Sequence, residues 1–499
     1  MSIPSLSFKQ AFTAQSINYY SFLNEYSSPE RYAASQLKYK IFCCVWAIAS
    51  IFHMANYNGF TLNLTFFLLT SAAIGLIAKP SSIVRLIIFI SMQMFQATLD
   101  LPGISNHWML TAFVNITILH SYVYLIIKRK SFYIDKVEFL NTFAPLVKIE
   151  LIVLYFYAVF HKLNAGFFDE EASCAVRFIL MQNNYYNILP SDQALLSLNI
   201  YATLILEAAI PLMLVFKRLR YWGILVGLVF HFIIAYNPIN GFYDFSSFVF
   251  ALYFLFTSTS FSYKIKTLYQ NFVRRKGVLK KQLLQFNIVN FVLFTVSLLF
   301  TLYLIYYYNK VFQDYFRHIV WTTYGLVFIG IFALSMNTKE KDKEKETNPF
   351  SYAHYSLLLF PVLVFLNGLC PYLGLKTESS YTMFSNLRTE GGISNHYIVP
   401  ASLQIFDYQK DIVEIVSTSE YHLKNVKKAD KLMTFFQFRR FVRTERPEFV
   451  TYKRNGVLKT FELDKATAND ELLQKDNYLL EKLMYYRYFN KSGVQECAH

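Results

Sequence analysis

The sequence predicts an all-α polytopic membrane bundle of about 11 spans followed by a small α+β extracytoplasmic domain. Composition is the first reason. The 499 residues are 54% hydrophobic and 18% aromatic, with a mean hydropathy of +0.29, whereas soluble domains are usually less apolar. The second reason is that long apolar stretches recur as far as residue 373. Many of them approach the roughly 20 residues needed to cross a bilayer.

Length and the absence of charge locate the individual spans within a transmembrane domain at 40–373. We expect them near 40–56, 60–78, 82–99, 108–127, 142–161, 194–216, 221–236, 243–260, 287–308, 317–336 and 355–373. The preceding segment, 1–39, is mixed and polar and has no signal-peptide pattern. We therefore predict that it is a cytoplasmic N-terminal segment.

Basic residues set the orientation of the spans. They concentrate in the loops after the fourth, sixth, eighth and tenth spans, at 128–136, 217–220, 264–281 and 339–346. Because basic loops stay in the cytoplasm, the N-terminus is predicted inside and the C-terminus outside. The same rule accounts for the net charge of +15, so no nucleic-acid partner is expected.

The chain becomes polar after residue 373, and 374–499 is predicted to form the extracytoplasmic α+β domain. Leu403–Ser417 has the alternation of strands. Phe449–Tyr452 and Val457–Leu463 flank Asn455-Gly456, a pair typical of a type I′ hairpin turn. Ala429–Val442 and Glu471–Tyr488 are expected to be helical.

The cysteine pattern and the missing motifs exclude several classes of protein. Five cysteines do not make a dense disulfide scaffold. Cys174 and Cys370 are both predicted on the oxidising side and are candidates for a disulfide with each other. The sequence has no glycine-rich phosphate loop, HExxH or CxxC pattern, so neither an ATP-driven protein nor a zinc hydrolase is supported, and no metal is expected.

Several polar residues fall on the outer side of this topology. They are Asn106 and His107 opening the fourth span, His161, Lys162 and Asn164 closing the fifth, Glu207 inside the sixth, His231 late in the seventh, Asp244 opening the eighth, and Arg388, Glu390 and His396 in the outer domain. Ionisable residues at membrane depth are candidates for function. We expect several of them to face one outward-opening cavity.

Lys162 is the strongest candidate because it follows Leu151–Phe160, a stretch without charge. Desolvation disfavours the ammonium form of a lysine, and a neutral amine would take a proton from a weak acid such as a membrane-soluble hydroquinone. The histidines would orient that substrate or stabilise an oxyanion. The alternatives are structural: Lys162 snorkels to the interface, the histidines cap or pack helices, and Glu207 fixes helix packing.

The motifs that carry these residues resemble those of a known family. Tyr155–Asn164, Asn106-His107, His231-Phe232 followed by 240–247, and the junction Met383–Pro400 are similar to segments of the vitamin K-dependent gamma-carboxylase and its bacterial relatives, the HTTM-domain proteins. The motifs occur in the expected order, and the resemblance covers about residues 35 to 400. The carboxylase has lysine and aspartate at the positions of His161 and Asn164, and it has a far longer lumenal part.

The resemblance implies a reaction. A lysine deprotonates a reduced naphthoquinone, oxygen adds to give a strong base, and that base removes the γ-proton of a peptidyl glutamate, which takes up CO2. Lys162 matches the catalytic lysine, and His107 and His231 match histidines of the active-site region. The implied cofactors are a vitamin K or menaquinone hydroquinone, O2 and CO2. The expected partners are membrane lipid and a secreted peptide or protein, and the expected location is a bacterial inner membrane.

A second class of function fits the same residues. The protein would bind or move a small lipid or peptide without catalysis, with Lys162 as an anchor for an anion. Some relatives in the family act in peptide-toxin maturation without known carboxylation. Lys162→Arg separates the two classes, because arginine keeps the charge of an anchor but cannot act as a base.

Overall fold

The computed structural model describes residues 29–57, 63–186, 191–237, 241–275, 310–336, 348–467 and 469–497. The described chain is mostly helical and has one small antiparallel sheet. It divides into two compact units. The first unit comprises 1–89, 121–144 and 249–349, and the second comprises 90–120, 145–248 and 350–499.

Among the residues that the structure describes, seven helices are long and apolar enough to cross a membrane, so the protein is an integral membrane protein. They are α2 (Pro29–Tyr57), α4 (Ile83–Asp100), α5 (Asn106–Arg129), α6 (Lys136–Phe160), α8 (Gln193–Val215), α13 (Lys310–Met336) and η1 (Tyr355–Leu358) together with α14 (Leu359–Leu373). Two shorter apolar helices are α3 (Leu64–Ala78) and α9 (Arg220–Ile234). A further helix, α7 (Cys174–Tyr186), precedes α8.

Each predicted span except 287–308 overlaps a helix, and 287–308 lies outside the described residues. The number of spans therefore stays a prediction. The eighth predicted span, 243–260, is not one straight helix. Its chain forms α10 (Tyr243–Leu255) and α11 (Thr259–Arg275), which meet at a bend of 111°.

Hydroxyl side chains explain the bend between α10 and α11. The Thr257 hydroxyl donates a hydrogen bond back to the Phe254 carbonyl at 2.8 Å, and Ser258 Oγ accepts one from the Phe261 amide at 3.3 Å. Such bonds satisfy the polar groups that are freed where one helix ends and the next begins. Because 243–260 is largely apolar, its sequence alone does not indicate this break.

The first unit is held together by aromatic packing. Trp321 of α13 is fully buried and contacts Phe52 of α2 edge-on, with 5.7 Å between ring centroids. Phe250 of α10 contacts the same indole ring at 5.4 Å. Aromatic pairs of this geometry stabilise beyond the area that they bury.

In the second unit, a glycine lets α14 approach α6 closely. A Cβ atom built at Gly368 would lie 2.2 Å from the Tyr157 ring. The Tyr157 hydroxyl donates a hydrogen bond to the Phe365 carbonyl at 2.8 Å, one turn earlier on α14. Small residues commonly allow membrane helices to pack in this way.

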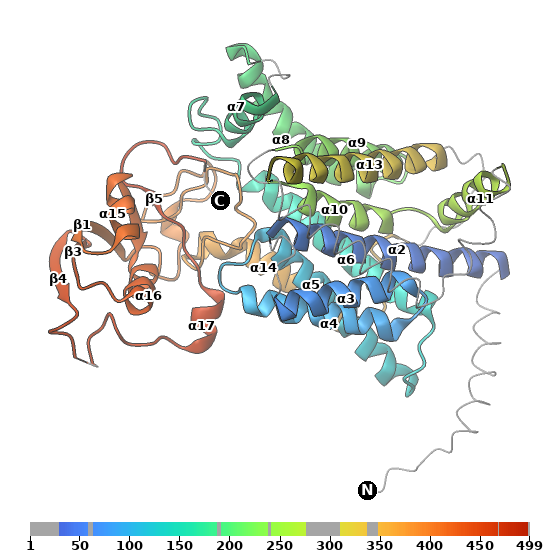
Figure 1. Cartoon of the computed structure of the whole chain (residues 1–499), viewed down its shortest axis with the longest axis horizontal. Helices are drawn as coiled ribbons and strands as arrows, with labels where there is room; N and C mark the ends of the chain where they lie inside the picture. The colour runs from blue at the N-terminus through green and yellow to red at the C-terminus, as the bar shows by residue number, and fades with distance from the viewer. Residues whose placement is uncertain are drawn as a thin grey trace, which may run out of the picture. The chain divides into compact units, whose positions relative to one another are not determined.

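The second unit also contains the C-terminal sheet, which Figure 1 shows in orange to red beyond α14. The strand order is β4-β3-β1-β2-β5, all antiparallel. The elements are β1 (Ile412–Thr418), α15 (Tyr421–Lys428), β2 (Lys431–Thr434), α16 (Phe435–Glu445), β3 (Phe449–Arg454), β4 (Val457–Glu462), α17 (Tyr478–Leu483) and β5 (Phe489–Asn490). Their buried core includes Val413, Leu423, Met433, Phe438 and Val450.

The hairpin prediction is confirmed, and the helix predictions are partly wrong. β3 and β4 pair around Asn455-Gly456, whose φ angles of 50° and 88° are those of a type I′ turn. The first part of the predicted helix 429–442 is instead β2, because this segment pairs with both β1 and β5. Thr434 then caps α16. In the predicted helix 471–488, only α17 is helical.

Gly374 carries a testable prediction for the end of α14. It has a left-handed φ of 81°, and a Cβ atom there would lie 2.0 Å from the Phe406 carbonyl oxygen. Gly374→Ala is expected to destabilise the protein by about 2–4 kcal/mol, because strain and a backbone clash add. Thermal unfolding in detergent measures the effect.

Gly392→Ala is the matched control for the clash. Gly392 also has a positive φ, 72°, but nothing lies within 4 Å of the position that a Cβ would take. It should cost only the left-handed strain, about 1–2 kcal/mol. Equal decreases in Tm for the two variants would show that the contact of Gly374 with Phe406 does not matter.

Candidate functional site

Lys162 pairs with Glu207 in the second unit. The last turn after α6 tightens, because the Lys162 amide bonds to the Val159 carbonyl at 3.0 Å. This places the side chain against α8, where its ammonium donates a hydrogen bond to the Glu207 carboxylate. Lys162 is only 6% exposed. A charge so far buried needs a partner of opposite sign, and Glu207 supplies it.

The ion pair contacts an aromatic ring and lies on the buried side of α8. The Lys162 Nζ atom stands over the Phe167 ring, 5.7 Å from its centroid. On α8, Tyr201 and Ile205 are exposed, whereas Glu207 lies on the opposite side of the helix, together with buried Ile210. In a membrane helix an exposed apolar face contacts lipid, so α8 has a lipid-facing side and a buried side that carries Glu207.

His231 of α9 is buried and bonded to Tyr155 of α6. Its Nε2 atom lies 2.7 Å from the Tyr155 hydroxyl. Tyr155 lies on α6, the helix that leads into the turn with Lys162.

His107 of α5 pairs with Asp244 of α10. Its Nε2 atom lies 2.9 Å from the Asp244 carboxylate, and both side chains are buried. The Phe245 ring links this pair to the neighbouring histidine, with its centroid 5.8 Å from that of His107 and 5.2 Å from that of His231. The carboxylate fixes the orientation of the imidazole.

The helix ends explain why these residues meet. α5 begins at Asn106 and α10 at Tyr243, whereas α6 ends at Phe160 and α9 at Ile234. Helices that alternate in direction across a membrane bring such starts and ends to one side. The structure thus pairs Lys162 with Glu207, His231 with Tyr155 and His107 with Asp244, and Phe245 contacts both histidines. Whether they share one cavity stays a prediction.

His161 supports the chain around Lys162. Its Nδ1 atom lies 2.8 Å from the Tyr372 hydroxyl, and its Nε2 atom lies 3.2 Å from the Ser380 carbonyl oxygen. A carbonyl oxygen only accepts, so Nε2 carries the proton and Nδ1 accepts from Tyr372. Both ring nitrogens are therefore used in fixing the turn after α6 to α14 and the segment that follows it.

Asn164 uses all four of its hydrogen-bonding positions. Its amide group donates to the carbonyls of His161 and Ser385, both at 2.6 Å. Its side-chain oxygen accepts from the Phe167 amide at 3.0 Å and from the Asn395 side chain at 3.1 Å. His161 and Asn164 are thus positioning residues for the loop that carries Lys162.

His396 and Asn106 fix the junction after α14 to the ends of other spans. His396 donates from Nε2 to the Phe160 carbonyl at 2.8 Å, and its Nδ1 accepts from the amides of Ile398 and Val399, both at 3.1 Å. Burial lowers the pKa of His396, although the Phe160 carbonyl opposes this effect. The Asn106 side chain accepts from the Tyr381 amide. Neither residue contacts the Lys162–Glu207 pair.

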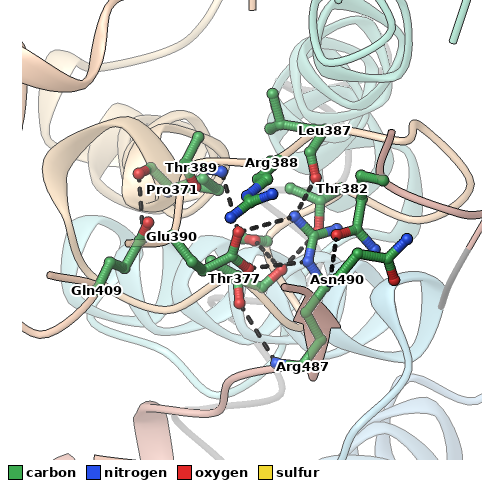
Figure 2. A network of polar contacts seen from close by, with 12 residues as sticks. Pro371, Thr377, Thr382, Leu387, Arg388, Thr389, Glu390, Gln409, Arg487 and Asn490 are labelled. Atoms are coloured by element: carbon green, nitrogen blue, oxygen red, sulfur yellow. Dashed lines mark hydrogen bonds and ion pairs between the residues drawn. The ribbon is translucent and has the colours of Figure 1, made fainter. Parts of the chain in front are cut away.

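Glu390 belongs to a separate buried network (Figure 2). Arg487 donates from Nε to its carboxylate at 2.9 Å and also donates to the Leu387 carbonyl. The Thr389 amide donates to the other carboxylate oxygen at 2.9 Å. Burial opposes the ionisation of Glu390, but the Arg487 guanidinium outweighs it and holds the pKa of Glu390 below its usual range.

Sequence reasoning missed Arg487 as the partner of Glu390, since it lies in the segment predicted to be helical. Arg388 does not join the ion pair. Its guanidinium stands 5.3 Å from the centroid of the Phe489 ring. Glu390, Arg388 and Arg487 therefore stabilise the junction between α14 and the C-terminal sheet rather than the cluster around Lys162.

The predicted disulfide between Cys174 and Cys370 is wrong. Cys174 is bonded to Cys497, and Cys370 is a free cysteine on α14. Asn386 explains the pairing, because its side chain accepts from the Cys174 amide at 2.9 Å and donates to the Gln495 carbonyl at 3.0 Å. It thereby holds the start of α7 beside the C-terminal segment.

Glu150 is a buried carboxyl that sequence reasoning missed, although a single acidic residue in an apolar span is a signal in itself. It is fully buried on α6, and one of its oxygens contacts the Thr117 hydroxyl. The other oxygen meets no hydrogen-bond partner within the described part of the chain. Burial without a cation favours the neutral acid.

Glu150 should therefore react with a hydrophobic carbodiimide, which attacks protonated carboxyls in membranes. We expect peptide mass mapping to find the adduct on Glu150 and not on Glu207, whose carboxylate is paired with Lys162. Glu150→Gln should abolish the adduct, and a water-soluble carbodiimide should give none. Labelling of Glu207 in preference to Glu150 would contradict this account of the two carboxyls.

Comparisons with known protein families, with curated proteins and with solved structures give no match.

Proposed function

We propose that the protein is a membrane enzyme of the carboxylase-like type suggested by its motifs. It would couple oxidation of a reduced naphthoquinone to proton abstraction and carboxylation of a peptidyl glutamate or a related substrate. The observation that carries the proposal is the buried Lys162–Glu207 ion pair, whose carboxylate lies on the buried side of the membrane helix α8. Two histidine pairs, His231 with Tyr155 and His107 with Asp244, lie in the same unit.

The ion pair is suited to taking a proton from a weak acid. Transfer of a proton from Lys162 to Glu207 leaves a neutral amine and a neutral carboxylic acid. The amine then accepts the proton of a phenolic hydroxyl. The products are an ammonium ion beside the new oxyanion and a protonated Glu207, so that no unpaired charge is left in the low-dielectric site.

The surroundings of Lys162 fit an aromatic, lipid-soluble substrate. The Phe167 ring lies over the ammonium, and Phe168 contacts Tyr201 of α8 with 5.6 Å between ring centroids. These rings would bind a flat naphthoquinone. When bound, the reduced naphthoquinone would supply, with oxygen, the strong base that carboxylation requires.

His107 and His231 would hold the substrate oxygens. Asp244 accepts a hydrogen bond from His107 or shares its proton, which leaves this imidazole fixed in orientation. Tyr155 does the same for His231. Histidines that are fixed in this way are effective donors to a developing negative charge, because they need no reorganisation when it forms.

The alternative of a non-catalytic anchor has less support. An anchor for an anionic lipid or peptide needs a cation that is open to the ligand, whereas Lys162 already binds Glu207. A transport protein or a peptide-toxin maturation factor stays possible only if the ligand displaces Glu207. Lys162→Arg separates these functions from catalysis.

We also propose that the cluster faces the outside of a bacterial inner membrane, with the N-terminus in the cytoplasm. Two observations support this orientation. Basic loops alternate along the chain, and the positive-inside rule keeps them in the cytoplasm. Cys174 lies in the segment between α6 and α8, the same segment that contains Lys162, and it forms a disulfide with Cys497. Disulfides persist in oxidising compartments.

The test uses purified protein in lipid nanodiscs. Reduced menaquinone, oxygen and labelled bicarbonate are supplied with a glutamate-rich peptide, and native protein is compared with Lys162→Ala. We expect oxidation of the quinone and fixation of the label to depend on Lys162. Exposed Lys410, which pairs with Asp407, provides the control variant Lys410→Ala. No lysine-dependent oxidation and no lysine-dependent fixation would refute the proposal.

A further inference from the structure

Residues 393–406, here called the apolar loop, expose large hydrophobic side chains. Ile393, Tyr397, Ile398, Leu403, Ile405 and Phe406 are between 40% and 71% exposed. No Asp, Glu, Lys or Arg occurs from Gly391 to Phe406. Surface loops of soluble regions seldom gather so many apolar side chains without a binding partner.

Backbone hydrogen bonds fasten the apolar loop to the ends of two membrane spans. The Tyr397 amide donates to the Leu163 carbonyl at 3.0 Å, just after α6. The Phe406 amide donates to the Leu373 carbonyl, the last residue of α14, also at 3.0 Å. Because both spans end there, the loop lies at the level where the hydrocarbon gives way to the headgroups.

The loop also continues the lipid-facing side of α8. Phe168 contacts Tyr397 with 5.9 Å between ring centroids and contacts Tyr201 of α8 at 5.6 Å. Tyr201 is itself exposed. Tyrosines are enriched at membrane interfaces, where the ring is in apolar surroundings and the hydroxyl meets water. The exposed apolar surface is thus continuous from α8 to the loop.

The loop is held rigidly enough to present these side chains. The Ser394 hydroxyl donates to the Val399 carbonyl at 2.7 Å, and Nδ1 of His396 accepts from the Ile398 amide at 3.1 Å. Pro400 precedes a short 3-10 turn at Ala401–Leu403. Since these bonds satisfy local polar groups, insertion of the loop into an interface leaves few of them unpaired.

We propose that the apolar loop is a lipid-binding surface that inserts into the interfacial layer of the bilayer on the side of Lys162. The occupant is lipid rather than a protein partner, because the loop is fastened to span ends and joins the lipid-facing side of α8. The loop therefore holds the junction of the C-terminal sheet against the membrane. This inference does not depend on quinone chemistry.

Spin labels placed in nanodiscs test the depth of the loop. The free cysteines Cys43, Cys44 and Cys370 are first replaced by serine, and single cysteines are then introduced by Ile398→Cys and Ile405→Cys. Labels there should collide with oxygen, which concentrates in lipid, and should be shielded from a water-soluble nickel chelate. Leu458→Cys on β4 is the matched control, since Leu458 is 60% exposed, comparable with the loop residues. Its label should show the opposite preference.

Photo-crosslinking keeps the test independent of the cysteine replacements. A benzophenone amino acid at Ile405 should attach to lipid, and the same group at Leu458 should not. Equal access of the nickel chelate to the loop and to Leu458 would overturn the proposal. So would crosslinks from Ile405 to a second copy of the chain in place of lipid, which would identify the loop as a contact between copies.

Discussion

Lys162→Arg is expected to lower the rate of hydroquinone oxidation by at least about 100-fold, the usual contribution of a general base. Arginine keeps the positive charge and the ion pair with Glu207, but it does not release its proton at neutral pH. The initial rate in nanodiscs that contain reduced menaquinone measures the effect. Lys162→Ala should lower the rate at least as much.

Glu207→Gln completes the comparison. Glutamine still accepts a hydrogen bond from Lys162 but cannot take its proton, so we expect a large loss of rate with the fold preserved. The Cys174–Cys497 disulfide reports the fold in each variant. If Lys162→Arg keeps the native rate or the native affinity for a bound lipid, Lys162 is an anchor and the catalytic proposal fails.

Arg487→Met is expected to have the largest effect on stability. It leaves the Glu390 carboxylate buried without its guanidinium, and breaking a buried ion pair in this way costs about 3–5 kcal/mol. Thermal unfolding of the purified protein measures the loss of stability, and the yield of folded protein gives a second measure of it. The double variant Arg487→Met with Glu390→Gln should recover part of it, because no uncompensated charge is then left.

An exposed pair provides the control for Arg487. Lys491 binds Glu414 on the surface of the sheet, and the two side chains are 44% and 31% exposed. Lys491→Met should leave the stability nearly unchanged, because exposed ion pairs contribute little. A similar loss for Lys491→Met and Arg487→Met would mean that the buried network in Figure 2 does not stabilise the junction.

The same network predicts a dependence of stability on pH. Arg487 holds the pKa of Glu390 below its usual range, so the unfolded chain binds a proton at a higher pH than the folded chain does. The contribution of Glu390 is therefore complete above the unfolded pKa, about 4.3, and is lost as the pH falls through the folded pKa. Between these values, the Tm of Glu390→Gln should fall less steeply on acidification than that of native protein. Parallel curves would contradict this assignment.

The sequence predicts the membrane helices well because each must bury its own backbone polar groups within an apolar segment. Local chemistry likewise predicts the Asn455-Gly456 turn. The break after Leu255 was not predicted, because the hydrogen bonds of Thr257 and Ser258 that stabilise it are not evident from an apolar sequence. β2 was not predicted either, because pairing with strands distant in sequence overrides its helical pattern.

The candidate site is predicted in part for similar reasons. Charge in an apolar context marks Lys162, Glu207 and His231 without knowledge of the fold. Partners far along the chain do not show in a pattern, so Arg487 and Cys497 were missed as the partners of Glu390 and Cys174. His161 and His396 looked like site residues, but their ring nitrogens are fully used by local hydrogen bonds.

The most direct test of the central claim is the ionisation state of a bound phenol. A naphthol whose absorption band shifts on ionisation is added to native protein in nanodiscs at a pH where it is neutral in lipid. We expect the spectrum of the ionised naphthol in native protein and that of the neutral naphthol in Lys162→Met. A neutral spectrum in both, with equal binding, would show that Lys162 does not take the proton.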